Sequence, residues 1–99
     1  MSNDESIEGL QRAVEGLHNC KAKYKDKTHV IETFEGSLVW DRDAYRFNVK
    51  DLPTAKLAYV WSSPIKGSTK RKFYAVLQVD PVKSAQDAVR ASIAKDYGG

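Results

Sequence analysis

The first side chains that could do chemistry together are His18 and Cys20, which only Asn19 separates. A histidine next to a cysteine can take the thiol proton and so activate a nucleophile. The same residues also lie at the end of an amphipathic pattern. Asn commonly ends a helix, and a cation near the carboxyl terminus stabilises the helix dipole. Cysteine is often a small buried hydrophobic residue as well. We therefore interpret this triplet as the end of a helix and expect no catalytic residue in it.

A second set of candidate ligands combines His29 with the acids Glu32, Asp41 and Asp43. Imidazole and carboxylate groups can hold a divalent ion, and paired carboxylates can cleave glycosides. The spacing matches neither kind of site. Both aspartates flank Arg42 and could pair with it or with Arg46 at the surface. We expect no metal site here.

A phosphate-binding loop is also missing, because Lys66-Gly67-Ser68-Thr69 lacks the upstream glycines and the following helix. We therefore expect no cofactor and no enzymatic activity, and interpret the chain as a protein that acts by binding.

Aromatic residues give the clearest indication of a binding surface. Those that fall on predicted strands are Trp40, Tyr45, Phe47, Tyr59, Trp61, Phe73 and Tyr74. Two small helices do not obviously cover both faces of a four-stranded sheet, so we expect part of one face to expose aromatic side chains. Trp40, Tyr59 and Trp61 are the residues that we expect to contact a small molecule or a protein partner. A homodimer formed on the sheet is the favoured use of this surface, with a foreign partner and ordinary core packing as alternatives.

Hydrophobic periodicity predicts the elements that carry these residues. Apolar positions three and four residues apart predict a helix over 4–18, and Ser84 with Asp87 opens a second helix that ends near residue 96. Strands are predicted at residues 28–35, 38–49, 57–62 and 73–79. The sequence thus predicts a single α+β domain, residues 1–99, of order α-β-β-β-β-α. Its four-stranded antiparallel sheet would carry both helices mainly on one face.

The strand predicted at 73–79 is apolar at nearly every position. A strand of this composition is usually buried on both faces. We therefore expect it to be central in the sheet and covered on both sides.

Composition and length set the class of protein. The chain has 99 residues, of which 41% are hydrophobic and 29% are charged, as is usual for a globular domain. No apolar run approaches the roughly 20 residues of a membrane helix, and the acidic start Asp4-Glu5 is unlike a secretory signal. Cys20 is the only cysteine, which excludes an internal disulfide. We expect a cytoplasmic protein that does not bind membranes.

The net charge of +3 is unevenly distributed and suggests an alternative function. Four lysines against one acid give residues 20–27 a charge of +3, and residues 64–80 carry the same excess. In the second segment Lys66, Lys70, Arg71 and Lys72 could contact phosphates, which would make loop 66–72 part of a nucleic-acid-binding module. A solvated basic loop is the other interpretation.

The layout with a basic loop resembles the double-stranded RNA-binding domain, which reads shape and phosphates. Two features depart from that family. There is a fourth predicted strand, and Ser84-Ala85-Gln86-Asp87 opens the second helix where the family would present lysines.

A longer resemblance covers about residues 28–94. It is carried by Val30-Ile31-Glu32-Thr33-Phe34, Pro53-Thr54-Ala55-Lys56, Ala58-Tyr59-Val60-Trp61-Ser62 and Pro81-Val82-Lys83-Ser84-Ala85. These runs resemble a set of small uncharacterised bacterial α+β proteins of the kind carried on mobile elements or gene cassettes. Leu52 stands where such relatives would have histidine before Pro53. The resemblance implies no activity.

Overall fold

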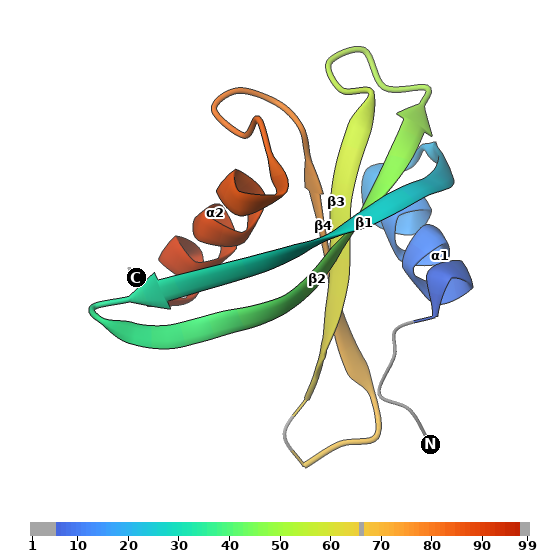
Figure 1. The fold of residues 1–99 in the computed structure, drawn as a ribbon. Helices are drawn as coiled ribbons and strands as arrows, with labels where there is room; N and C mark the ends of the chain where they lie inside the picture. The colour runs from blue at the N-terminus through green and yellow to red at the C-terminus, as the bar shows by residue number, and fades with distance from the viewer. Residues whose placement is uncertain (1–5, 66, 98–99) are drawn as a thin grey trace.

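The computed structural model describes residues 6–65 and 67–97, which form two helices and four strands (Figure 1). In chain order these elements are α1 (Ile7–His18), β1 (Lys21–Phe34), β2 (Ser37–Lys50), β3 (Leu57–Pro64), β4 (Arg71–Leu77) and α2 (Ala85–Tyr97). The strands form one antiparallel sheet of order β1-β2-β3-β4. The predicted α+β class and order of elements are confirmed.

The largest difference from the predicted boundaries is at β1, which begins at Lys21 rather than at residue 28. In the first half of β1, lysines occupy alternate positions. Because lysine is depleted in strands, the composition of this half does not predict a strand. At the other end of β1, Glu35-Gly36 forms a two-residue turn into β2. Both turn residues have positive φ, 52° and 82°, as a type I′ hairpin requires.

One extra residue, Lys25, interrupts the pairing of β1 with β2. It lies between the cross-strand pairs Tyr24–Phe47 and Asp26–Arg46. Side chains alternate between the faces of a strand, so one inserted residue exchanges the faces of all residues beyond it. Lys25 therefore reverses the orientation of the second half of β1.

This bulge lets one strand contribute to two cores. Ala22, before the bulge, packs in the core beneath α1, and Val30, after it, packs in the core beneath α2. In an uninterrupted strand these two even-numbered residues would share a face.

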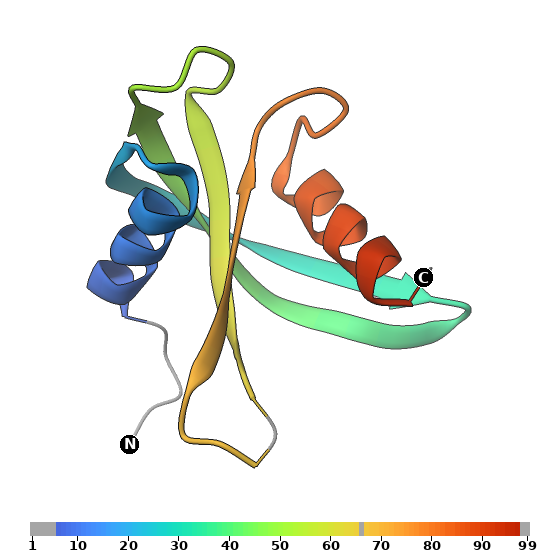
Figure 2. The same ribbon diagram turned by 180° about the vertical axis from the view of Figure 1, so that it is seen from behind.

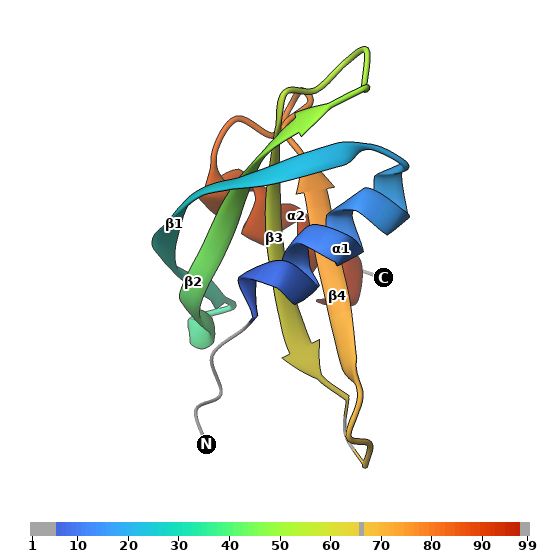
Figure 3. The ribbon, with the colours of Figure 1, turned by 90° about the vertical axis from the view of Figure 1, so that its right-hand side faces the viewer.

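The two helices cover opposite faces of the sheet, which corrects the expectation that they pack mainly on one face. Figure 3 shows α1 across the near face of β3 and β4, with α2 behind the sheet. β3 explains this arrangement, because Ala58 and Val60 pack under α1 while Tyr59 and Trp61 pack under α2. A strand that is apolar on both faces needs a cover on each. No helix among the described residues is long and apolar enough to cross a membrane.

The two hairpins share only a short stretch of the sheet. β2 pairs with β3 over four residues of each strand, and beyond them the hairpins separate (Figure 1). Arg42 spans the separation, since its guanidinium donates to the Ser62 carbonyl and, at 3.2 Å, to Ser63 Oγ. A backbone carbonyl that has lost its strand neighbour is thus bonded by a side chain.

β4 lies at an edge of the sheet, which corrects its expected central position. It is apolar on both faces for the reason expected, since Ala75 packs toward the α1 core and Tyr74 toward the α2 core. Figure 2 shows β4 at the front of the molecule with one helix on each side. The faces of the strand are partly covered, and its outer backbone edge is not paired with another described strand.

Candidate functional site

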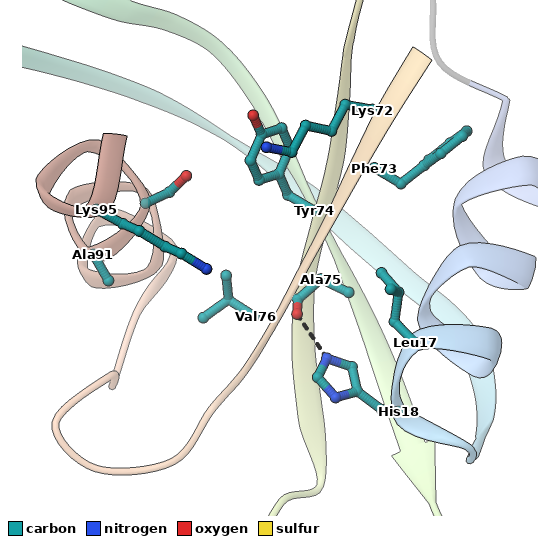
Figure 4. Close-up of a pocket in the computed structure, with 10 residues that line it drawn as sticks. Leu17, His18, Lys72, Phe73, Tyr74, Ala75, Val76, Ala91 and Lys95 are labelled. Carbon is teal, nitrogen blue, oxygen red and sulfur yellow. Dashed lines mark hydrogen bonds between the residues drawn. The ribbon is translucent and has the colours of Figure 1, made fainter. Parts of the chain in front are cut away.

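The outer edge of β4 forms the floor of a groove between the helices (Figure 4). Leu17 and His18 of α1 line one wall, and Ala91, Ser92 and Lys95 of α2 line the other. The groove encloses about 390 Å³, within the roughly 300–1,000 Å³ of ligand pockets. An edge strand presents unpaired N–H and C=O groups, so this floor can form backbone hydrogen bonds.

His18 connects α1 to this edge. Its Nε2 lies 2.7 Å from the carbonyl oxygen of Ala75, and because a carbonyl only accepts, Nε2 carries the proton and donates it (Figure 4). The N–H and C=O of one residue in an antiparallel strand point to the same side. The Ala75 N–H therefore also points into the groove.

Positive charge lies on the α2 side of the groove. The Lys72 ammonium lies 5.2 Å from the centre of the Tyr74 ring, and Lys95 extends from α2 toward Val76 (Figure 4). Lys72, Tyr74 and Val76 alternate toward the same face of β4. The described residues that line the groove include no acid, so this wall attracts anionic groups.

Apart from His18, the α1 side of the groove is apolar. Leu17 is 59% exposed and Phe73 is 39% exposed, although both are large hydrophobic residues. Exposed apolar side chains that gather in a concave site usually mark a contact surface. The two walls thus differ in chemistry on either side of one strand.

Two of the three aromatic residues expected at an exposed surface lie in the core. Tyr59 and Trp61 are 2% and 1% exposed, because α2 covers the face that was expected to be open. Trp61 stacks on Tyr74 with ring centres 5.5 Å apart, and Trp40 meets Trp61 edge-on at the same distance. Trp40 is half-buried, with the Arg42 guanidinium 5.5 Å from its ring centre. Tyr59 and Trp61 therefore cannot reach a partner in this structure, although Trp61 supports Tyr74 at the groove.

The predicted anion-contacting residues are used differently from one another. Lys66 lies outside the described residues, and Lys70 is exposed beyond the groove. Arg71 donates to Ser62 Oγ at 2.8 Å and to the Ser62 carbonyl at 3.2 Å, so it is held against β3. Of the described members of this set, Lys72 alone lines the groove.

His29, Asp41 and Asp43 come together on an exposed face of the β1–β2 hairpin. His29 Nδ1 lies 2.9 Å from Asp43 Oδ1, and Nε2 lies 2.5 Å from Asp41 Oδ1. The hydrogen bonds, with Asp43 first, raise the pKa of His29, since a carboxylate at each nitrogen favours the doubly protonated ring. Glu32 lies apart from this trio and accepts from Arg90 Nε at 2.7 Å.

The three residues form an ion-pair cluster in which both imidazole nitrogens donate. Among the described residues, no group of three His, Cys, Asp or Glu side chains has the geometry to hold a metal ion.

Cys20 and His18 form no nucleophilic pair. His18 donates to β4, and Cys20 Sγ lies 3.8 Å from the carbonyl oxygen of Val14. Burial first, and then the charges of Glu15 and Asp51, raise the pKa of the thiol. A reactive cysteine needs the opposite shift.

No family model matches the chain, and neither a curated protein nor a solved structure matches it. The resemblance to small bacterial proteins therefore stays a prediction. The role of the groove is inferred from its own geometry and chemistry.

Proposed function

We propose that the protein is a non-enzymatic binding protein that takes up an extended segment of another protein as an added strand along β4. The observation that carries the proposal is an edge backbone at the floor of a groove with a helix on each side. Strand addition uses backbone hydrogen bonds for affinity and the flanking side chains for specificity. At β4 the outward Ala75 N–H and the flanking side chains supply these contacts, while the Ala75 carbonyl already accepts from His18.

The composition of the groove supports binding rather than catalysis. His18, the residue type that most often acts as a general base, already donates to the Ala75 carbonyl. The rest of the lining consists of the strand edge, apolar side chains, one serine, one tyrosine and two lysines. Such groups recognise a chain but supply no arranged acid and base.

A second copy of the chain fits this edge poorly. The homodimer expected from the sequence needed an exposed aromatic face, which α2 covers. Two β4 edges paired about a twofold axis would bring Lys72 and Lys95 of both copies to the same side of the joined sheet. Lysines on an edge strand oppose such pairing. We therefore propose a different chain as the partner.

The proposal is tested by removing the outward backbone donor with Ala75→Pro. Proline has no N–H and is tolerated on edge strands, and the ladder with β3 uses the opposite side of β4. The probe is a displayed library of random nine-residue peptides, selected on the wild-type protein. We expect the selected peptides to bind Ala75→Pro about tenfold more weakly, which corresponds to one lost hydrogen bond.

The matched control is Ala75→Ser, which keeps the N–H and should retain affinity within about threefold. Thermal unfolding shows whether both variants fold, and amide exchange on the wild type should show protection of Phe73 and Ala75 when peptide is bound. If no peptide is recovered, or if folded Ala75→Pro binds as tightly as the wild type, β4 is not the binding edge.

A further inference from the structure

We propose that the segment taken up by β4 is acidic on one face and apolar on the other. This inference rests on the proposed function and specifies its partner. It follows from the two walls of the groove, which meet the two faces of any strand added at this edge. Neither wall alone would define such a pattern.

The α2-side wall selects the acidic face. Side chains of an added strand on this side would lie near Lys72, Tyr74 and Lys95. Lys95 extends toward Val76, which is four residues beyond Lys72 on β4. Four residues span about 13 Å along a strand, so the two ammonium groups are spaced along the groove. Two carboxylates two to four residues apart on the partner could therefore each meet one ammonium group.

The α1-side wall selects the apolar face. The residues of the partner between its acids would point toward Leu17 and Phe73. Both side chains are partly exposed, so an apolar contact removes their surface from water. The partner is thus an extended segment that alternates apolar and acidic residues.

A second β4 does not have this pattern. Its apolar residues Phe73, Ala75 and Leu77 alternate with Lys72, Tyr74 and Val76. The strand contains no acid; its sequence is Arg71-Lys72-Phe73-Tyr74-Ala75-Val76-Leu77. Charge complementarity therefore favours an acidic partner over self-association.

The experiment uses two nine-residue probes, one alternating valine with glutamate and one alternating valine with lysine. Fluorescence anisotropy measures their affinity for the full chain at low and high salt. We expect the glutamate probe to bind the wild type about tenfold more tightly than the lysine probe, because two partly exposed ion pairs replace two repulsions. The preference should shrink in high salt.

Reversing the groove charges with Lys72→Glu and Lys95→Glu together should invert the preference. The control reverses two exposed lysines of β1, Lys21→Glu and Lys23→Glu, and changes net charge equally. It should keep the preference, and an equal inversion there would show that net charge rather than the groove selects the probe.

The outcomes separate this inference from the proposed function. Equal affinity for both probes, lost in Ala75→Pro, would overturn the acidic partner and leave strand addition in place. If the wild type binds neither probe and no library peptide, both the acidic partner and strand addition are overturned.

Discussion

The sheet has two outer edges, β1 and β4, which are protected in different ways. Along β1, Glu15 Oε2 accepts from the Ala22 N–H at 2.8 Å, and Gln86 Nε2 donates to the Ile31 carbonyl at 2.9 Å. The bulge at Lys25 interrupts the strand between these two points. Bulges, lysines and covering groups all prevent an edge from pairing with another chain.

β4 has less protection of this kind. His18 bonds one carbonyl of the strand, and the pairing with β3 runs from Leu77 to Arg71 without a shift in register. A regular edge strand at the floor of a groove is suited to accept another strand. Both helices thus bond the backbone of β1 with side chains. On either side of β4 they form walls, and His18 bonds the Ala75 carbonyl while the Ala75 N–H still points into the groove.

The largest expected effect comes from deleting Lys25. The deletion removes the bulge but no apolar side chain, and forces residues on one side of it to exchange faces. Either Ala22 or Val30 then leaves its core. We expect the free energy of unfolding to fall by at least about 4 kcal/mol, a large share of the stability of a small domain. Urea denaturation measures the change.

The matched control for the deletion is Lys25→Ala, which keeps the residue count and therefore the bulge. An exposed substitution of this kind should change stability by less than about 0.5 kcal/mol. A deletion variant as stable as the wild type would show that the bulge does not set the register of β1.

β4 shows which features of the fold the sequence predicts and which it does not. Its apolar pattern predicts a central strand covered on both faces. In the structure β4 is an edge strand whose faces pack toward the two cores, and all of its residues remain partly or fully exposed. Face burial and edge pairing are independent, because helices can cover the faces of a strand at any position in a sheet. Only strand order shows that the backbone of β4 is available.

The same limit applies to the site residues. Lys72 was named from the charge of its segment, whereas Leu17 and Lys95 enter the groove only because the helices lie on opposite faces. Asp41 and Asp43 were correctly grouped with His29, since neighbouring strands of a hairpin place them within reach. The pairing of neighbouring strands in a hairpin can be predicted from the sequence, whereas the packing of helices distant in the chain cannot.

A smaller effect distinguishes the caps of the two edges. Glu15→Ala leaves the Ala22 N–H without its charged acceptor, and we expect a loss of about 1–2 kcal/mol in the free energy of unfolding. His18→Ala removes the bond to Ala75 and should cost about 1 kcal/mol. Urea denaturation gives both values, and amide exchange should accelerate at Ala22 only in the Glu15 variant.

Glu15→Gln is the control, because its side-chain oxygen still accepts from Ala22, and it should lose less stability than Glu15→Ala. Faster exchange at Ala22 in His18→Ala as well would mean that the two edges are not protected independently.

The smallest effect concerns the ion-pair cluster on β1 and β2. Asp43→Asn removes the first cause of the raised His29 pKa, so that pKa should fall toward its ordinary value of 6.5. NMR titration of the ring protons measures it. Asp26→Asn is the control, because Asp26 pairs with Arg46 at 2.5 Å and should leave the His29 titration in place.

The direction of the pH dependence follows from the same pair. A histidine whose pKa is raised in the folded state stabilises the fold fully below its unfolded pKa and loses this contribution as pH rises through the folded pKa. Hydrogen bonding to His29 first, and then to Lys27, lowers the pKa of Asp43. The contribution of Asp43 to the stability of the fold is therefore present above its ordinary pKa of 3.8 and is lost as the pH falls below that value. The cluster should therefore stabilise the hairpin most between these limits. A wild-type stability that rises through pH 7, with no such rise in Asp43→Asn, would contradict this assignment.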